Sequence, residues 1–369
     1  MATRFAAGRV PIDRIDVSAY RIPTDFSESD GTFEWTETTL VVVEATAGEV
    51  RGLGYSYAAD AAARLIRERL ARSVEGGDAM AVAGSWSEMV RAVRNLGRPG
   101  IASTAIAAVD NALWDLKARL LDLPLVTLLG AVRDGVPAYA SGGFTSYSIP
   151  QLQKQLGGWI AEGFSRVKMK VGRHPAADLD RVRAAREAIG PGPELFVDAN
   201  GAYGRKEALA MAEAFAEFGV TWFEEPVSSD DLEGLRLLRD RAPAGMAIAA
   251  GEYGYDLPYF ARMLEAGAVD ILQADATRCG GITGFLQTGP LCDARSMPLS
   301  AHTAPSLHTH PCCALARTVH VEYFYDHARI ERMLFDGAIS PSGGMLKPDL
   351  SRPGLGLELK RADAEKYAV

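Results

Sequence analysis

Three carboxylates each follow a short apolar run in the middle of the chain. Asp198 follows "ELFV", Glu224 follows "VTWF" and Glu252 follows "MAIAAG". If these runs are neighbouring parallel strands, the three side chains converge at one edge and repel one another unless a cation is present. Three oxygen ligands favour a hard divalent ion, with Mg²⁺ the first choice and Mn²⁺ the second. A single such carboxylate would more often cap a helix or pair with an arginine, but three at consecutive strand ends predict a metal site.

Two lysines lie one residue apart in the preceding apolar run, "VKMKV". Side chains at i and i+2 of a strand share a side, so Lys168 and Lys170 point the same way. An edge strand guarded by lysines would also produce this pattern. Beside a metal and each other, both ammonium groups should have a pKa below the usual value of about 10.4. A lysine that is neutral part of the time can act as a base.

A carboxylate and an imidazole follow two later runs. Asp275 ends "DILQAD" and His302 ends "SMPLSAH". Placed on adjacent strands they would form a carboxylate–imidazole pair, which fixes the tautomer of the histidine and raises its basicity. A base on each face of a metal-bound substrate is what proton abstraction α to a carboxylate requires.

These residues need elements that deliver them to one place. A unit of helical stretch, glycine and β-rich run recurs with Gly163, Gly190, Gly219 and Gly267 before the runs. Glycine after a helix supplies the left-handed cap, and continuous apolar runs suit strands buried on both faces. About eight such strands alternate with helices, which predicts an α/β fold with either a closed barrel or an open doubly wound sheet. We favour the barrel, because chemically active groups come from nearly every strand end rather than from one switch point.

The organisation predicted from these patterns has three segments. Residues 1–130 combine a β-hairpin or meander in "ETTLVVVEATAGEVRGLGYS" with helices, and "IASTAIAAVDNALWDLKARLLDLP" is the strongest helical pattern. They form an α+β domain before a barrel over residues 131–343. The segment 344–369, rich in Pro, Gly and Leu, folds back onto the first domain.

The composition excludes several classes of protein. A net charge of −8 over 369 residues offers no basic field for nucleic acid or an anionic membrane. No apolar run long enough to span a bilayer and no secretory leader are apparent, so we expect a cytoplasmic location. Four cysteines without a Cys-x-x-Cys pair indicate reduced thiols. The stretch "HTHPCC" (308–313) has no usual zinc spacing, which favours a structural role.

The whole set of motifs resembles the enolase superfamily, specifically its mandelate racemase subgroup. The segments "VKMKV", "VDAN", "FEEP", "AGE", "DATRCGGIT" and "SAHT" recur in the family's order over nearly the whole chain. The resemblance implies an α+β capping domain on a modified (β/α)7β TIM barrel. It also implies one Mg²⁺ held by Asp198, Glu224 and Glu252.

The resemblance further assigns roles around that ion. Lys170 would be the base on one face with Lys168 as its electrostatic neighbour, and His302, paired with Asp275, would serve the other face. Glu322 would hydrogen-bond the substrate carboxylate as an electrophile. Asn200 and Arg278 would contact the substrate. Family members also often assemble as homo-oligomers, from dimers to octamers.

One position separates subgroups of the family. Muconate-lactonising and dipeptide-epimerising relatives carry a lysine as second base on the sixth strand, whereas this chain has Asp275 there and His302 on the seventh. The reaction implied is abstraction of the α-proton of a small carboxylate. Loss of a β-hydroxyl would then give a 2-keto-3-deoxy acid from a sugar acid, an aldonate or aldarate. Return of the proton on the opposite face would instead give racemisation or epimerisation.

Substrate choice should come from two loops of the capping domain, near 20–37 and 54–59. We expect Tyr20, Trp35 and Tyr55 to contact the substrate. An acid of the first loop facing the pocket would disfavour a second substrate carboxylate, although Arg21 could reverse this. A Schiff-base aldolase using Lys168 or Lys170, or a non-catalytic relative, would be alternatives. The first leaves the carboxylates unexplained, and the second conflicts with the filled catalytic positions.

Overall fold

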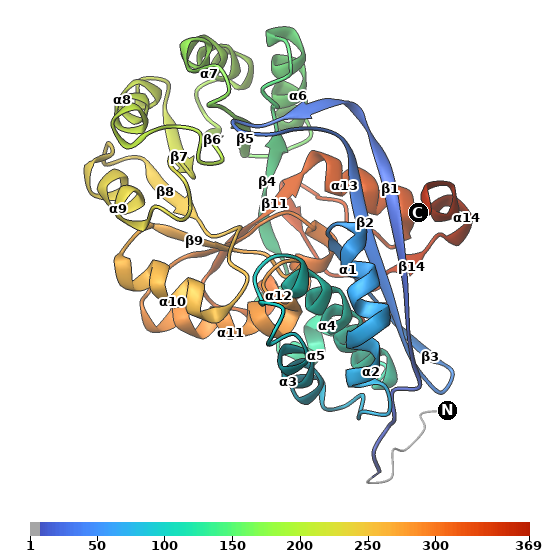
Figure 1. The fold of residues 1–369 in the computed structure, drawn as a ribbon. Helices are drawn as coiled ribbons and strands as arrows, with labels where there is room; N and C mark the ends of the chain where they lie inside the picture. Colours follow the sequence, from blue (N-terminus) through green and yellow to red (C-terminus); the bar gives the residue numbers. More distant parts are fainter. Residues whose placement is uncertain (1–7) are drawn as a thin grey trace.

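The computed structural model describes residues 8–369 and has two parts, an antiparallel capping sheet with helices and a parallel barrel (Figure 1). Figure 1 places the capping elements β1–β3 and α1–α4 on one side of the barrel. The barrel strands are β4 (Val136–Gly142), β5 (Arg166–Lys170), β6 (Glu194–Asp198), β7 (Val220–Glu224), β8 (Ala247–Ala250), β9 (Ile271–Ala274), β10 (Leu299–Ala301) and β11 (Thr318–Phe324).

The barrel is closed, because β11 pairs in parallel with β4 and each other strand pairs with its sequence neighbours. Seven helices connect the eight strands, which confirms the (β/α)7β arrangement implied by the resemblance. They are α6 (Ile149–Ala161), α7 (Pro175–Ile189), α8 (Arg205–Ala216), α9 (Leu232–Arg241), α10 (Leu257–Ala266), α11 (Gly281–Ala294) and α12 (Pro305–Ala314).

The recurring glycines end helices as the sequence predicts. Gly163, Gly190, Gly219 and Gly267 all have a positive φ, between 61° and 96°. Residues other than glycine rarely adopt this conformation, so each glycine turns the chain from a helix toward the next strand. The chain therefore reaches each strand in the same orientation, and the carboxyl ends of all eight strands face one mouth.

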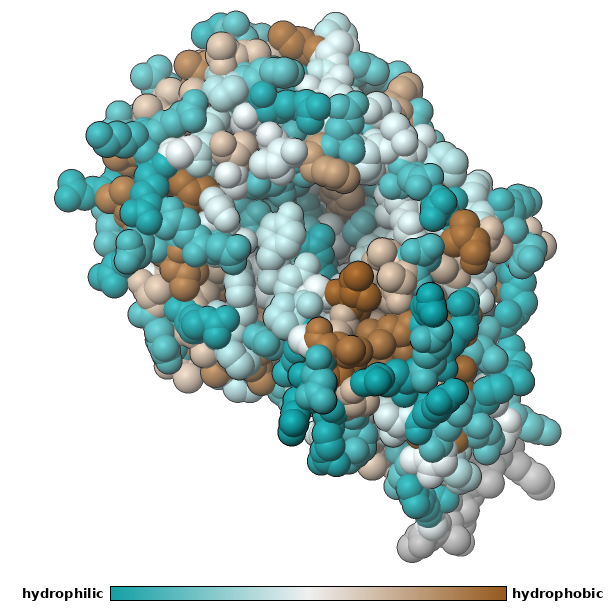
Figure 2. Space-filling view, viewed as in Figure 1, coloured by the Kyte–Doolittle hydropathy of each residue, from teal (hydrophilic) through white to brown (hydrophobic). Residues whose placement is uncertain are grey.

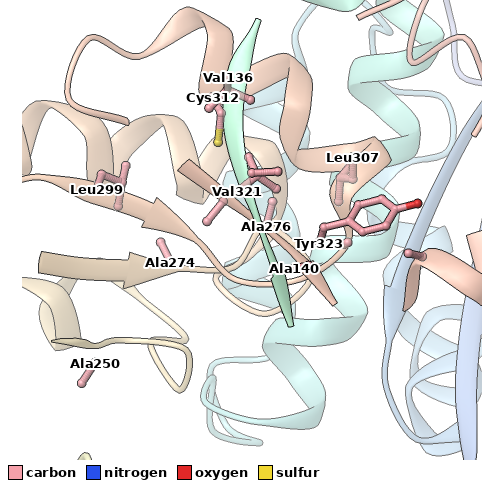
Figure 3. Packing of buried hydrophobic residues seen from close by; sticks show 14 of the residues in the cluster. Val136, Ala140, Ala250, Ala274, Ala276, Leu299, Leu307, Cys312, Val321 and Tyr323 are labelled. Carbon is pink, nitrogen blue, oxygen red and sulfur yellow. The ribbon is translucent and has the colours of Figure 1, made fainter. Parts of the chain in front are cut away.

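The core lies between the strands and the helices around them. In Figure 3, Val136 of β4 and Val321 of β11 lie near Cys312 of α12, and Leu299 of β10 and Ala274 of β9 belong to the same cluster. All five side chains are fully buried. This apolar layer holds the strand ends in place beneath the site.

The capping part is a three-stranded antiparallel sheet covered by helices. Its strands are β1 (Arg14–Ser29), β2 (Glu34–Ala47) and β3 (Val50–Tyr57). Its helices are α1 (Asp60–Leu65), η1 (Ile66–Leu70), α2 (Ala71–Val74), α3 (Val82–Ala92) and α4 (Ile101–Leu120), followed by α5 (Leu125–Leu129). The β2–β3 hairpin and the helix before Pro124 confirm the predictions for this region.

The first predicted loop is mostly strand. Most of residues 20–37 continue β1 and β2, and the turn between them is limited to residues 30–33. The ladder shifts register between Pro23 and Glu28, where the hairpin bends. The sequence prediction of a long loop there was wrong, because pairing with β2 extends β1 well past Tyr20.

The C-terminal segment returns to the capping sheet. After α13 (Tyr325–Leu334), short strands β12 (Phe335–Asp336) and β14 (Glu358–Leu359) pair with each other, and β13 (Met345–Leu346) pairs antiparallel with β4. Beyond α14 (Arg361–Ala364) and η2 (Glu365–Tyr367), Ala368 forms a β-bridge to Tyr20. The Val369 N–H donates to the carbonyl of Ala19.

The face drawn in Figure 2 is hollowed near its middle. Hydrophilic residues dominate the outline of this face, and a hydrophobic patch lies beside the hollow. Among residues 8–369, no helix combines the length and apolar character that crossing a bilayer requires.

Candidate active site

Three carboxylates meet at the carboxyl ends of β6, β7 and β8. Asp198, Glu224 and Glu252 are buried, and each offers an oxygen within 4.8 Å of the others. Within residues 8–369 they are the one group of at least three His, Cys, Asp or Glu side chains placed to hold a metal ion. The register explains the convergence, because Asp198 pairs directly with Glu224 across the β6–β7 ladder.

Backbone and side-chain contacts fix these oxygens. Glu252 follows Gly251, whose φ is 138° and whose added Cβ would lie 2.0 Å from the Gln273 carbonyl oxygen, so only glycine fits there. The Trp222 indole N–H donates to Glu224 Oε2 at 2.9 Å. No sequence motif predicted the Trp222 contact, although Trp222 lies two residues before Glu224 and therefore on the same face of β7.

Both lysines of β5 point at the carboxylates. Lys170 Nζ lies 2.5 Å from Asp198 Oδ2 and 3.1 Å from Asn200 Oδ1. Lys168 Nζ lies 2.6 Å from Glu224 Oε1 and 2.9 Å from Glu322 Oε1. The shared side predicted from "VKMKV" is therefore confirmed, and the interpretation as an exposed edge strand is wrong because β5 is central.

Ion pairs with the carboxylates raise the pKa values of both lysines, whereas a bound metal is expected to lower them. Burial would lower the pKa of Lys170, but the Asp198 carboxylate outweighs burial and raises that pKa above its usual value. Burial would also lower the pKa of Lys168, but the Glu224 carboxylate outweighs burial and raises it. These direct ion pairs oppose the lowering expected from a metal and a second lysine, and that lowering stays a prediction for the Mg²⁺-bound site.

His302 forms the predicted pair with Asp275. His302 Nδ1 lies 2.8 Å from Asp275 Oδ2, and His302 Nε2 lies 3.1 Å from Glu252 Oε2. Burial would lower the pKa of His302, but Glu252 and the bond to Asp275 raise it to about 9. The imidazole is therefore protonated at neutral pH and can donate a proton from Nε2.

Glu322 of β11 is an acceptor in this arrangement. Its Oε2 accepts from the Thr303 N–H at 3.2 Å, while Oε1 faces Lys168. Burial would raise the pKa of Glu322, but Lys168 and then His302 lower it to about 2. In this state Glu322 accepts hydrogen bonds, and donation to the substrate carboxylate, the role that the resemblance implies, stays a prediction.

The site carries less positive than negative charge. Three cations, Lys168, Lys170 and Arg278, face five carboxylates, so the formal charge of the group is −2, or −1 when His302 is protonated. The five carboxylates are Asp198, Glu224, Glu252, Asp275 and Glu322. Burial and then Asp198 raise the pKa of Glu224 to about 8, against the opposing effect of Lys168. Oxygen ligands, burial and charge all fit Mg²⁺.

A cavity of about 630 Å³ opens over these groups. Three of the five predicted substrate contacts line it: Asn200, Arg278 and Trp35. The predicted catalytic residues Lys170, His302 and Glu322 line it as well. Arg278 Nη1 lies 3.2 Å from Glu252 Oε1 and its guanidinium lies 5.1 Å from the Tyr253 ring centroid.

Two predicted substrate contacts lie elsewhere. The Tyr55 side chain is fully buried, and its hydroxyl donates to Glu331 Oε1 at 2.6 Å. Tyr20 is 5 % exposed and packs in the core beside the C-terminal segment. Neither lines the cavity, because both side chains pack in the apolar core that the capping sheet shares with the barrel and the C-terminal segment. Tyr57 lines the cavity in their place.

Other lining residues were not identified from the sequence. Tyr253 follows Glu252 directly, and His327 lies in the first turn of α13, which begins as β11 ends at the mouth. That position after a barrel strand is the signal that could have found His327. Thr303, with a φ of 53°, follows His302 at another strand end. Backbone strain of this kind concentrates at functional sites.

The "HTHPCC" stretch forms no metal site among the described residues. His308 Nε2 accepts from the Ala276 N–H at 2.7 Å, and His310 Nδ1 accepts from the Val126 N–H at 3.3 Å. The four cysteines are free and buried. These histidines therefore hold the chain behind Asp275 and have a structural role.

Comparisons with known proteins agree with this geometry. Residues 17–130 match the mandelate racemase / muconate lactonizing enzyme N-terminal domain, and residues 151–364 match the enolase C-terminal domain-like family. The chain is 34% identical over 368 residues to a 3,6-anhydro-alpha-L-galactonate cycloisomerase of Streptomyces coelicolor, covering 97% of this chain and 99% of that one.

Solved structures are also similar. A mandelate racemase/muconate lactonizing enzyme-like protein from Rubrobacter xylanophilus is 57% identical, with a TM-score of 0.95 over 97% of this chain and 100% of that one. The L-talarate/galactarate dehydratase of Salmonella typhimurium, liganded with Mg and L-lyxarohydroxamate, is 29% identical with a TM-score of 0.89, covering 100% of this chain and 96% of that one. The chain therefore belongs to the enolase superfamily, in its mandelate racemase subgroup.

Proposed function

We propose that this protein is a Mg²⁺-dependent sugar-acid dehydratase. It abstracts the proton α to the carboxylate of an aldonate or aldarate and eliminates the β-hydroxyl, giving a 2-keto-3-deoxy acid. One observation carries the proposal: two nitrogen groups flank the carboxylate triad from opposite ends, Lys170 beside Asp198 and His302 beside Glu252. Asp198, Glu224 and Glu252 would hold the ion.

When bound, Mg²⁺ neutralises the triad and stabilises the negative charge that develops as the substrate carboxylate becomes an enediolate. Lys168 contributes fixed positive charge to the same region, because it is fully buried against Glu224 and Glu322. Mg²⁺ on Asp198 would remove the main cause of the raised pKa of Lys170, and Lys170 Nζ would then take the α-proton on its side of the cavity, oriented by Asn200 Oδ1.

His302 suits the role of acid toward the leaving hydroxyl. Asp275 fixes the Nδ1–H, so the exchangeable proton sits on Nε2, which lies 3.8 Å from Glu322 Oε2. Protonation of a hydroxyl as the C–O bond breaks releases water rather than hydroxide. Against burial, Glu252 and the hydrogen bond to Asp275 raise the pKa of His302, and with Glu252 bound to Mg²⁺ the bond to Asp275 would still favour the protonated imidazole.

Isomerisation is the second candidate function. The relative named as a 3,6-anhydro-alpha-L-galactonate cycloisomerase aligns along almost the whole chain. The same Lys170 and His302 would then return a proton to the α-carbon without loss of water, which gives racemisation or epimerisation. Cycloisomerisation requires in addition that the β-leaving group is a ring oxygen of the substrate, so that the C–O bond breaks, the ring opens and the oxygen takes a proton without release of water. Both functions share the first step, proton abstraction, and differ in the fate of the intermediate.

The experiment that tests the proposal is a screen of aldonates and aldarates with Mg²⁺. Semicarbazide detects 2-keto-3-deoxy products, and NMR in D₂O monitors exchange of the α-proton. Dehydration of at least one acid supports the proposal. Exchange without a semicarbazide-reactive product supports isomerisation instead, and absence of exchange across the panel contradicts both functions.

A further inference from the structure

The part of the cavity lined by the capping domain and the start of α13 is called the capping end here, and its turn at residues 30–33 reaches the barrel next to the ends of β5 and β6. That end is built by the β1–β2 hairpin, the end of β3 and the start of α13. The residues are Asp30, Thr32, Phe33, Trp35, Glu37, Thr38, Thr39, Tyr57, Ala58, Ala59, Phe324 and His327. A sugar acid whose carboxylate lies at the triad would be enclosed by these residues, because they line the same cavity. The chemistry of this end therefore decides which groups the far end of the substrate can carry.

The capping end carries negative charge only. Among the cavity-lining residues that the structure describes, its charged side chains are Asp30 and Glu37. The lining cations Lys170 and Arg278 both belong to the triad end, where each is paired with a carboxylate. A second substrate carboxylate would enter this region without a partner of opposite charge, which is unfavourable for a desolvated ion.

Two arginines that contact the hairpin, Arg21 within it and Arg173 after β5, are paired outside the lining. Arg21 Nε lies 3.2 Å from Glu37 Oε1, and Arg173 Nη2 lies 2.7 Å from Glu34 Oε2. Neither arginine is among the residues that line the cavity. Arg21 thus offsets part of the charge of Glu37 but does not present a guanidinium to a ligand.

The position of Asp30 is fixed. Its Oδ1 accepts from the N–H groups of Thr32 and Phe33 at 2.6 and 2.7 Å, and its carbonyl accepts from the Thr145 hydroxyl at 2.8 Å. The next residue, Gly31, packs so closely that an added Cβ would lie 2.3 Å from the Ala199 carbonyl oxygen. The turn is therefore docked on the barrel beside the site, and Asp30 is 9 % exposed at the cavity wall.

His327 and Tyr57 form an uncharged aromatic part of the same cavity wall, in contrast to the acidic Asp30 and Glu37. Their rings stack with centroids 3.3 Å apart and an interplanar angle of 8°. The Tyr57 hydroxyl donates to the His327 carbonyl at 3.2 Å, which holds the pair together. His327 is 8 % exposed, and its Nδ1 has no hydrogen-bond partner among residues 8–369. That nitrogen is itself buried, so the exposed edge of the His327 ring at the cavity wall is the part that a ligand hydroxyl can reach.

The charge state of His327 also suits an uncharged, hydroxylated ligand group. Burial and then the neighbouring His302 hold the pKa of His327 well below its usual range. A neutral imidazole offers one donor and one acceptor, which suits hydroxyl groups or a ring oxygen and does not compensate a carboxylate. The Thr38 hydroxyl is already engaged with Asp326 Oδ2 at 2.5 Å.

We propose that this cavity selects sugar acids with a single carboxylate, binding their uncharged, hydroxylated far end at His327 and Tyr57 and excluding aldarates through Asp30 and Glu37. The proposal rests on the proposed function and names its substrate class: aldonates, including anhydro forms with a ring at the far end.

The test compares hexonate and hexarate pairs that share configuration at C2–C5, such as galactonate with galactarate and gluconate with glucarate. Calorimetry with the Mg²⁺-loaded protein gives affinities, and NMR in D₂O gives α-proton exchange. We expect the hexonate of an accepted pair to bind at least about 10-fold more tightly than its hexarate, from one uncompensated charge contact. Equal or tighter hexarate binding overturns the proposal.

Single variants test the contribution of Asp30 to this preference. Asp30→Asn keeps the Oδ1 acceptor for Thr32 and Phe33 but removes the charge, and should reduce the preference for the hexonate about threefold or more. Glu34→Gln is the matched control, since Glu34 lies in the same hairpin outside the cavity lining, and should leave the preference unchanged. An unchanged preference in Asp30→Asn contradicts the role of Asp30.

His327→Phe tests the far-end subsite. It preserves an aromatic ring on Tyr57 and removes the hydrogen-bonding nitrogens, so the KM for the hexonate should rise about 10-fold while kcat stays within about twofold. An unchanged KM would contradict the subsite. Failure of the proposed function is a different result: neither acid of any pair would exchange its α-proton, in wild type or variants, and the specificity proposal would fall with it.

Discussion

His302 Nδ1 lies 2.8 Å from Asp275 Oδ2, across neighbouring strand ends at the mouth of the barrel. Asp275 is itself held by the Thr277 N–H at 2.6 Å and is 1 % exposed. The imidazole therefore has one fixed face toward Asp275 and one face toward Glu252 and the cavity. This pairing divides the site into a lysine side and a histidine side.

Asp275→Asn tests that division. The Asn amide can present N–H instead of an acceptor to His302, which favours the wrong tautomer and lowers the pKa of the imidazole. We expect kcat to fall roughly 100-fold or more while Mg²⁺ affinity changes little. Steady-state kinetics and calorimetry provide the readouts, and wild-type kcat in this variant would show that Asp275 does not position His302.

Lys170→Ala and His302→Asn should each reduce kcat by roughly 10²–10⁴-fold, the usual contribution of a general acid or base. Circular dichroism should show native folding for both variants, because neither side chain belongs to the apolar core. Turnover at the wild-type rate in either variant would refute the assignment of a group on each side.

Metal removal should lower stability in a way that depends on the triad. A ligand at about 100 times its Kd adds about 2.7 kcal/mol to the free energy of unfolding, so Mg²⁺ should raise Tm and EDTA should reverse the rise. Asp198→Asn and Glu224→Gln should abolish most of this increase. Glu233→Gln, a change at an exposed residue of α9, is the control and should respond to Mg²⁺ as the wild type does. A full increase in Tm in the triad variants would place the ion elsewhere.

Glu28 should make stability depend on pH. It is fully buried, with Oε2 accepting from the Trp35 indole at 3.0 Å, and burial and then Asp326 raise its pKa to about 9. The folded state then retains a proton that the unfolded state releases, so this group's contribution to stability falls as pH rises from about 4.5 toward 9, by at most about 1.4 kcal/mol per pH unit.

Glu28→Gln removes this titration. The variant should gain stability relative to the wild type as pH rises from 6 to 8, measured by urea unfolding at each pH. Glu233→Gln should instead run parallel to the wild type. Parallel curves for Glu28→Gln and the wild type would show that Glu28 is ionised in the folded protein.

Gly31→Ala tests how the hairpin turn is docked. The new Cβ would meet the carbonyl oxygens of Ala199 and Val171 at 2.3 and 2.7 Å, so the turn must move. We expect a loss of about 1–3 kcal/mol in stability and a higher KM, because Asp30 moves with the turn. Gly158→Ala in α6 has open space around it and should instead be neutral or stabilising. A wild-type KM in Gly31→Ala would show that the turn does not shape the cavity.

The strand-end residues were predictable because they depend on local rules. Period-two alternation placed Lys168 and Lys170 together, and glycine after each helix marked where Asp198 and Glu224 would follow a strand. The charge state of these groups was not predictable, since it depends on ion pairs between strands distant in sequence, such as Lys168 with Glu322. The same dependence made Glu322 an acceptor.

The residues that line the capping end were less predictable from the sequence. Tyr20 and Tyr55 are residue types that often contact substrates, yet both are buried in the core that the capping sheet shares with the barrel and the C-terminal segment. Only the packing of the sheet between these parts and α4 decides which side chains are buried. Tyr57 and His327 meet across 270 residues, which no local pattern reports. The three-segment division at residues 130 and 343, the cytoplasmic location and the homo-oligomeric state stay predictions.

The most direct test of the two-sided site is exchange of the α-proton of a sugar acid in D₂O, measured by NMR with and without Mg²⁺. We expect exchange by the wild-type protein only when Mg²⁺ is present, and none by the double variant Lys170→Ala/His302→Asn. Exchange at the wild-type rate without the ion, or in the double variant, would contradict the assignment of the metal and of its two flanking nitrogen groups.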